Sequence, residues 1–153
     1  MQLEFAKMTR EIYSVILKDL GGYGGFPFYA AMILLFVLLR DFEFVYRLIV
    51  SLVAVSASVA ILRLAYFKPR PGQKKKSYSI FYERIDNSSF PSVHTARAVM
   101  ISIALFTKAP VLLPLLVLMM IIVCASRLHF KRHYLVDVVA GLVIGLILGL
   151  VFF

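Results

Sequence analysis

Side chains able to move protons and bind anions are grouped at three places in an otherwise apolar chain. In chain order they are Arg63, Arg70, Ser92, His94, Arg127, His133 and Asp137. Ionisable groups are costly beside lipid, so their presence among apolar segments indicates function. Guanidinium forks match phosphate oxygens, and histidine can donate a proton or attack phosphorus. The set therefore predicts a phosphoryl-transfer site that works without a metal ion.

The third group contains a candidate nucleophile. His133 and Asp137 are four residues apart where a helix is expected to begin, which places them on one face and within reach of each other. The carboxylate of Asp137 is expected to accept a proton from one imidazole nitrogen, leaving the other nitrogen free to attack. His94, at the start of another expected helix, is a candidate general acid. Ser92 and the backbone N–H groups of that helix start would add hydrogen bonds to an anion.

The elements that must position these side chains are apolar helices. Five apolar segments cover residues 26–39, 48–62, 98–106 with an extension back to 93, 111–125 and 134–153. Several are shorter than the ~20 residues that cross a bilayer, but flanking aromatic and arginine side chains can supply the missing length. Residues 1–20 alternate charged and apolar positions at helical spacing, which is typical of an amphipathic interfacial helix.

We therefore expect an all-α fold, a polytopic membrane helix bundle of about five transmembrane helices plus the N-terminal interfacial helix. A single domain would cover residues 1–153, with an active-site loop at 63–91. Glycines 141, 145 and 149 repeat every fourth residue in the last segment, and small residues let helices approach closely within one chain. Since the i+4 ridge drifts by roughly 160° around the helix between residues 133 and 149, Gly149 is expected to contact a different helix from Gly141.

The composition agrees with a lipid environment. Hydrophobic residues make up 61% of the chain and charged residues 16%, against roughly 45–50% and 25% in soluble domains. Such a small soluble protein could not bury so much apolar side chain. The 17 Lys+Arg against 8 Asp+Glu indicate an anionic partner. Phosphate-bearing lipid is favoured over nucleic acid, because little of the chain remains outside the membrane.

The three groups together resemble the signature of the type 2 phosphatidic acid phosphatase superfamily, the integral-membrane lipid phosphate phosphatases. The matching motifs are Arg63-x6-Arg70-Pro71, Pro91-Ser92-Val93-His94 and Ser126-Arg127-x5-His133-x3-Asp137. Two positions depart from the family pattern. Arg63 stands where lysine is usual, and Val93 stands where glycine is usual. Valine would be strained at a positive φ, so we expect Val93 to begin a normal helix with its N–H facing the phosphate.

The resemblance implies a mechanism. His133 would attack phosphorus and become phosphohistidine, oriented by Asp137, and His94 would protonate the departing oxygen and then activate water. Arg63, Arg70, Arg127, Ser92 and Val93 would bind the phosphoryl oxygens. No cofactor or metal is expected. The substrate would be a membrane lipid phosphate or diphosphate, such as undecaprenyl diphosphate, phosphatidylglycerol phosphate or the 1-phosphate of lipid A.

Alternatives stay open at this point. His129, His133 and Asp137 have the residue types of a metal triad, although the nearby arginines would repel a cation. A small membrane anion or lipid transporter could use the same arginines, but it would not need a nucleophile with its own carboxylate. A vanadate-dependent haloperoxidase shares this pocket in soluble relatives, and the apolar composition opposes it.

The location follows from the same resemblance. The family's site faces the outer side, so we expect a multi-pass protein of the inner (plasma) membrane with a periplasmic active site. The excess of Lys and Arg on that side argues for the opposite orientation, but several of those charges belong to the site itself. The protein is expected to be a monomer or a weak homo-oligomer.

Overall fold

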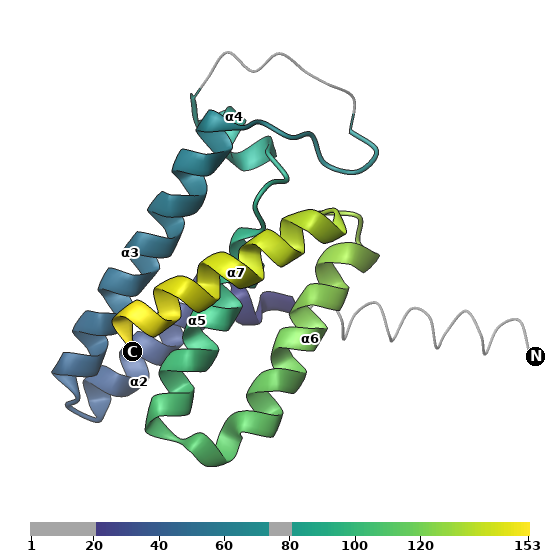
Figure 1. Ribbon diagram of the computed structural model, residues 1–153. Coiled ribbons are helices and arrows are strands. Elements are labelled where there is room, and N and C mark those ends of the chain that lie inside the picture. Colours follow the sequence, from purple (N-terminus) through teal and green to yellow (C-terminus); the bar gives the residue numbers. More distant parts are fainter. Residues whose placement is uncertain (1–20, 74–80) are drawn as a thin grey trace, which may run out of the picture.

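A computed structural model describes residues 21–73 and 81–153, and these residues are helical with no strand among them (Figure 1). The α-helices are α2 (Phe26–Leu38), α3 (Phe42–Ala65), α4 (Phe81–Asn87), α5 (Val93–Lys108), α6 (Leu113–His129) and α7 (Leu135–Phe152). Two short 3-10 helices, η1 (Gly21–Gly24) and η2 (Pro110–Leu112), precede α2 and α6. The amphipathic helix predicted for residues 1–20 lies outside the described residues.

The predicted fold class, an all-α membrane helix bundle, is confirmed. Each of the five apolar segments forms a helix, and the third begins at Val93, as expected. By length and composition, α3, residues 110–129 and α7 can each cross a membrane. Helices α2 and α5 are shorter, with 13 and 16 residues. At 1.5 Å per residue, α5 is about 24 Å long, less than a hydrocarbon core of about 30 Å.

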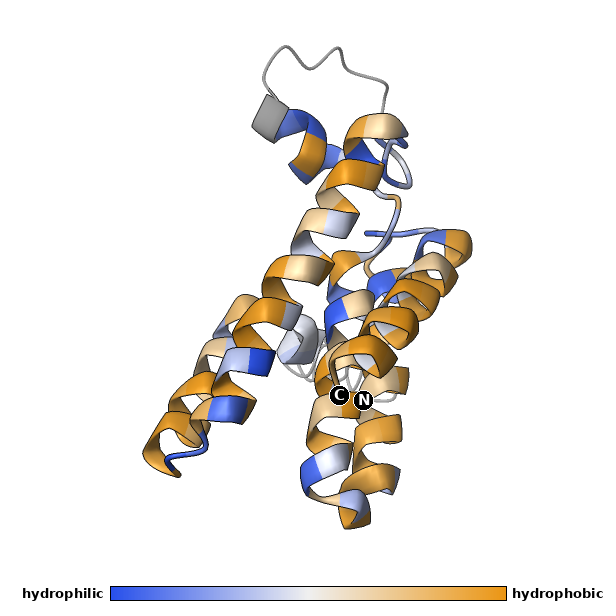
Figure 2. Cartoon of the chain, turned by 60° about the vertical axis from the view of Figure 1, so that its left-hand side comes forward, coloured by the Kyte–Doolittle hydropathy of each residue, from blue (hydrophilic) through white to orange (hydrophobic). Residues whose placement is uncertain are grey.

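Helix α5 is the centre of the bundle. It packs against α3, α6 and α7, and its residues from Thr95 to Ser102 are all buried. The other helices shield it from lipid, which is why it tolerates polar residues such as Thr95, Arg97 and Ser102. Apolar side chains cover the outer helices, while the polar residues gather toward the two ends of the bundle (Figure 2).

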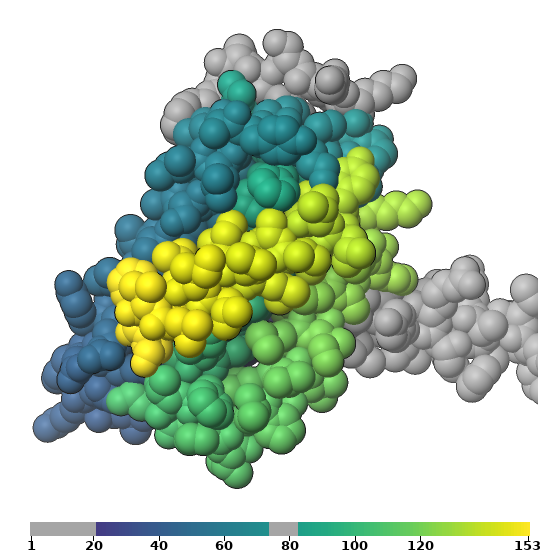
Figure 3. Space-filling model, viewed as in Figure 1, coloured from purple at the N-terminus to yellow at the C-terminus, as the bar shows by residue number. Residues whose placement is uncertain are grey.

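Helix α7 crosses α5 diagonally and covers much of it from one side (Figures 1 and 3). The glycine ridge forms this seam. A Cβ at Gly141 would lie 2.6 Å from Ser92 O, one at Gly145 would lie 2.4 Å from Ala96 O, and one at Gly149 would meet the side chain of Ile103. The expectation that Gly149 contacts a different helix is wrong. The ridge does drift around α7, but the diagonal crossing follows the drift, as it does when i±4 ridges interlock.

Polar residues form two regions, one at each end of the helix bundle. At one end, Asp41 accepts a hydrogen bond from Phe44 N at the start of α3 and forms an ion pair with Lys108 at the end of α5. At the other end, the last turns of α3 and α6 lie near the first turns of α5 and α7 (Figure 1). All three motifs fall at this second end.

Candidate active site

The three motifs line one cavity of about 630 Å³ at the second end of the bundle. Arg63 and Arg70 come from the first motif, Val93 and His94 from the second, and Arg127 and His133 from the third. The remaining wall is formed by Asp86, Phe130 and Arg132. Segments more than 60 residues apart in the sequence thus build a single basic pocket. Of the predicted site residues, Ser92 and Asp137 are not on its wall.

The loop after α3 is joined to the loop before α5. Ser89 N donates to Lys68 O at 2.7 Å, and Pro69 and Ser88 form an isolated antiparallel bridge. Arg63 is buried at the end of α3, and its guanidinium donates to Pro91 O at 2.9 Å and to Ile85 O at 2.9 Å. These contacts hold the first motif beside the second.

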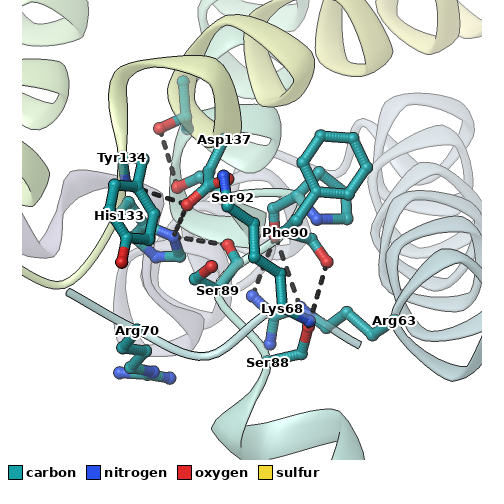
Figure 4. A network of polar contacts seen from close by, with 12 residues as sticks. Arg63, Lys68, Arg70, Ser88, Ser89, Phe90, Ser92, His133, Tyr134 and Asp137 are labelled. Atoms are coloured by element: carbon teal, nitrogen blue, oxygen red, sulfur yellow. Dashed lines mark hydrogen bonds and ion pairs between the residues drawn. The ribbon is translucent and has the colours of Figure 1, made fainter. Parts of the chain in front are cut away.

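The ring of His133 is fixed by a backbone carbonyl of the loop before α5 (Figure 4). The ring is buried, and Nδ1 lies 2.6 Å from Ser89 O. A carbonyl oxygen only accepts, so Nδ1 carries the proton and Nε2 has a free lone pair. Burial lowers the pKa of His133 to about 4; the Ser89 carbonyl opposes this shift, and Arg63 and Arg70 add to it. The imidazole is therefore neutral at pH 7, which is the form that a nucleophile requires.

Asp137 does not orient His133 directly, contrary to the sequence-based expectation. Its Oδ2 is 3.9 Å from His133 Nδ1, beyond hydrogen-bond distance, and instead accepts from Tyr134 N at 2.8 Å. The spacing argument failed because Tyr134 is the N-cap of α7, so His133 precedes the helix and the two residues do not share a helical face. The carbonyl of Ser89 takes the orienting position.

The buried carboxylate of Asp137 has a different partner, which the sequence did not suggest. Lys68 Nζ lies 2.7 Å from Asp137 Oδ1 and 4.3 Å from the centroid of the Tyr134 ring (Figure 4). Lys68 lies in the variable stretch of the first motif. The one signal for it in the sequence is its positive charge, two residues before Arg70. The ion pair ties the first motif to the third.

The second motif presents a helix N-terminus to the cavity. Val93 is the first residue of α5, and its φ is not positive, since Arg40 and Lys131 are the non-glycine residues of the described chain that have positive φ. Valine therefore fits a normal helix start, as expected. The first N–H groups of a helix lack intrahelical acceptors, and they favour an anion here.

Ser92 is placed differently from the prediction. It is buried and does not line the cavity. Its Oγ accepts a hydrogen bond from Thr95 Oγ1 at 2.9 Å, and its N–H donates to Asp137 O at 3.0 Å. As the N-cap of α5, Ser92 joins the start of α5 to the start of α7. Its contacts are structural, because α7 packs directly over this position, and they do not place its hydroxyl on a bound phosphate.

Arg70 and Arg127 line the cavity, and each is held by a backbone carbonyl of a different segment. Arg70 Nη2 donates to Asp86 O at 2.7 Å, and Arg127 Nη2 donates to Gly21 O at 3.0 Å. The glycine-rich 3-10 helix η1 therefore packs next to the site. Gly24 of η1 packs against the start of α5, since a Cβ on it would lie 2.0 Å from the carbonyl oxygen of His94.

The metal alternative finds no support in the geometry. His129 is exposed, with its ring 5.1 Å from that of Phe130. Within residues 21–73 and 81–153, no three His, Cys, Asp or Glu side chains converge as metal ligands. The cationic groups that line the cavity suit an anion instead.

An all-α bundle with apolar outer faces and a basic, histidine-bearing cavity at one end defines a membrane protein suited to phosphate chemistry. The chain belongs to the PAP2 superfamily, whose family model matches residues 44–153 and so includes all three motifs. Among solved structures, the crystal structure of Aquifex aeolicus LpxE is similar, with a TM-score of 0.75 and 22% identity over 92% of this chain and 85% of that chain. That likeness supports the fold. No curated protein sequence matches this chain significantly.

Proposed function

We propose that this protein removes phosphate from a membrane lipid phosphate or diphosphate through a phosphohistidine on His133. Membership of the PAP2 superfamily supports the phosphatase activity. The observation that carries the mechanism is the state of His133: Nδ1 is engaged by Ser89 O, Nε2 is free, and the ring lies on the wall of a cavity with three arginines from two of the motifs.

In the first step, Nε2 of His133 attacks phosphorus as the bond to the lipid oxygen breaks. His94, on the same cavity wall, donates a proton to that oxygen. Burial and the neighbouring arginines lower the pKa of His94 to about 3 in the absence of substrate, so it takes up this proton when the anionic substrate binds and offsets the positive charge of those arginines. Arg63, Arg70 and Arg127, with the α5 N-terminus at Val93, stabilise the charge on the equatorial oxygens. Their guanidinium groups already donate to backbone carbonyls, which keeps them in place before substrate arrives.

In the second step, water attacks the phosphohistidine. His94, now neutral, accepts a proton from this water, the N–P bond breaks, and inorganic phosphate leaves. Asp137 supports His133 indirectly. Ser92 N donates to its backbone carbonyl, and its carboxylate pairs with Lys68, whose backbone carbonyl accepts from the N–H of Ser89, the residue that orients His133. The arginines supply the positive charge that a metal supplies in many phosphatases, so we infer that the reaction is independent of metal ions.

The nucleophile is tested by trapping. After an alkaline detergent quench, base-stable and acid-labile labelling from a lipid carrying ³²P in the transferred phosphate is expected in the wild-type protein and in His129→Ala. It is expected to be lost in His133→Ala together with at least about 1,000-fold of the activity. His129 is the matched control because it is exposed and outside the cavity. Activity retained by His133→Ala would refute the nucleophile, and activity lost in EDTA and restored by zinc or magnesium would refute metal independence.

We infer a location in the inner membrane with the cavity on the periplasmic side. The basis is the resemblance of the three motifs, since the distribution of Lys and Arg favours the opposite orientation. Reporter fusions inserted after residues 41 and 72, which lie at opposite ends of α3, distinguish the two arrangements.

A further inference from the structure

A second, smaller cavity continues from the catalytic one toward the middle of the bundle. Its volume is about 330 Å³, and it shares Arg63, Asp86, Val93 and His94 with the catalytic cavity. Its own walls are Phe26, Ser56, Val59, Ala60, Ile85 and Arg97, from α2, α3, α4 and α5. His94 thus lies on the wall between the two cavities, with His133 on the catalytic side only.

Arg97 is an unusual residue for this position. It is 5% exposed, one turn after His94 on the central helix, and the ion pairs of the described chain do not include it. Nη2 donates to Ser56 Oγ at 2.8 Å, the guanidinium carbon lies 3.8 Å from the centroid of the Phe26 ring, and the buried Nε has no acceptor. A buried guanidinium without a carboxylate costs several kcal/mol, so an anion is the partner that it lacks.

The direction of the reaction indicates which anion. In an in-line displacement the leaving group departs on the side opposite the nucleophile. His133 approaches from the catalytic cavity, so the leaving group moves past His94 into the smaller cavity. A lipid monophosphate would release an alcohol there, whereas a lipid diphosphate would release a lipid phosphate, whose charge matches Arg97. With Arg63 and Arg97 against Asp86, the charged side chains of this cavity sum to a positive charge.

We propose that Arg97, held by Ser56 and Phe26, is a second anion subsite that binds the leaving phosphate of a lipid diphosphate. This proposal rests on the proposed function and specifies its substrate. Nε2 of His133 forms a bond to the terminal phosphorus, the bond from that phosphorus to the bridging oxygen breaks, and its electron pair stays on the bridging oxygen. His94 protonates this oxygen, and Arg97 balances the negative charge that remains on the leaving lipid phosphate. Water then releases inorganic phosphate and restores His133.

The test compares two substrates with the same tail, farnesyl diphosphate and farnesyl monophosphate, in mixed micelles. We expect the wild-type kcat/KM to favour the diphosphate by at least about 10-fold, and Arg97→Met to lower it about 100-fold for the diphosphate but less than about 3-fold for the monophosphate. Arg97→Lys should fall between these. Arg40→Met, which removes an exposed arginine at the far end of the bundle, should change neither rate.

The outcomes separate the two proposals. Equal effects of Arg97→Met on both substrates, or no effect on either, would overturn the subsite while leaving the phosphatase intact. A wild-type protein that hydrolyses neither lipid would overturn both. Because removal of an unpaired buried charge should not destabilise the fold, the melting temperature of Arg97→Met without ligand is expected to equal or exceed that of the wild type. Should Arg97→Met fail to fold, Ser56→Ala must give a loss specific to the diphosphate, and an equal loss on both substrates refutes the subsite.

Discussion

His133 lies one residue before the N-cap of α7, and this position decides its chemistry. Outside the helix, its backbone N donates to Arg127 O at 3.3 Å and its ring turns toward Ser89 O. The proposed nucleophile therefore comes from the third motif, and the carbonyl that orients it comes from the loop before the second. Small movements of residues 88–91 would misalign the imidazole, because the carbonyl that fixes its tautomer is in this loop.

The titration of His133 gives a prediction with a definite sign. An unperturbed histidine titrates at about 6.5 in the unfolded chain, whereas burial lowers the pKa of His133 to about 4 in the folded protein. Between these values the unfolded state binds more protons, so the free energy of unfolding rises with pH across this interval and falls on acidification. In NMR spectra of histidine-labelled protein, the His133 signal can be identified by its loss in His133→Gln. This signal should not titrate near pH 6.5. A His133 resonance that titrates there would contradict the buried, neutral imidazole.

Lys68 provides a second prediction at this scale. Asp137 is 0% exposed, so loss of Lys68 would leave a buried carboxylate without its counter-ion. Lys68→Met is expected to lower the free energy of unfolding by about 2–4 kcal/mol. The double variant with Asp137→Asn should recover most of this loss, because asparagine still accepts from Tyr134 N and carries no charge. Thermal unfolding in detergent measures both variants, and additive losses in the double variant would exclude coupling between the two side chains.

At the scale of elements, helix seams without room for a Cβ hold the site. The start of α7 lies against Ser92, Thr95 and Ala96, and η1 lies against His94 on another side of α5. Gly141 and Gly145 in the first seam and Gly24 in the second bring backbone against backbone, which no flexible side chain can relieve. The elements around the cavity therefore pack at distances that only glycine allows at these contacts.

Gly24 and Gly22 make a matched pair to test this. A Cβ on Gly24 would lie 2.0 Å from His94 O, whereas one on Gly22 would have no atom within 4 Å. Gly24→Ala should therefore shift the start of α5, destabilise the protein by about 1–3 kcal/mol and remove most of the activity, while Gly22→Ala should stay within about 0.5 kcal/mol. Phosphate release and thermal unfolding compare the two. Equal tolerance of both substitutions would show that η1 does not support His94.

Much of the architecture and the composition of the site could be predicted from the sequence. Hydropathy located the five helices, and the arginines and histidines at the helix ends located the cavity. Polar side chains are costly beside lipid, so in a membrane bundle they are concentrated at helix ends. The hydrogen bonds could not be predicted in the same way. The partner of His133 is the backbone carbonyl of Ser89, and any residue type at position 89 would provide such a carbonyl. The Lys68–Asp137 ion pair depends on the conformation of the loop after α3, which hydropathy does not predict. Asp86, Phe130 and Arg132 reach the cavity only through tertiary packing.

At the scale of the whole molecule, the catalytic cavity lies at one end of a bundle whose sides are apolar (Figure 2). A substrate with a long tail can keep that tail in the surrounding lipid or detergent while its phosphate lies in the cavity. Apolar groups such as Val59 and Ile85 also form part of the wall of the smaller cavity between α2, α3 and α5.

This arrangement predicts selectivity for lipids over soluble esters. At ~0.8 kcal/mol per buried CH₂, a long tail contributes far more binding energy than the small headgroup surface. Phosphate release from lipid phosphates should exceed that from p-nitrophenyl phosphate by at least about 100-fold in kcat/KM, even when lipid rates are compared at a fixed surface concentration. A soluble ester cleaved as efficiently as every lipid tested would rule out a contribution of the tail.

The parallel packing of α5 and α7 has a consequence for how the protein is made. Chains emerge from the ribosome N-terminus first, so α5 enters the membrane while its glycine-facing side, with Ser92 and Thr95, still has no partner. Helix α6 must cross back before α7 can cover that side. His133 and Asp137 arrive with α7, after Arg63, His94 and Arg127 are already in place. Biogenesis therefore completes the cavity with the segment that carries the proposed nucleophile, and we expect a nascent chain that has inserted only as far as α6 to lack phosphatase activity toward the lipids around it.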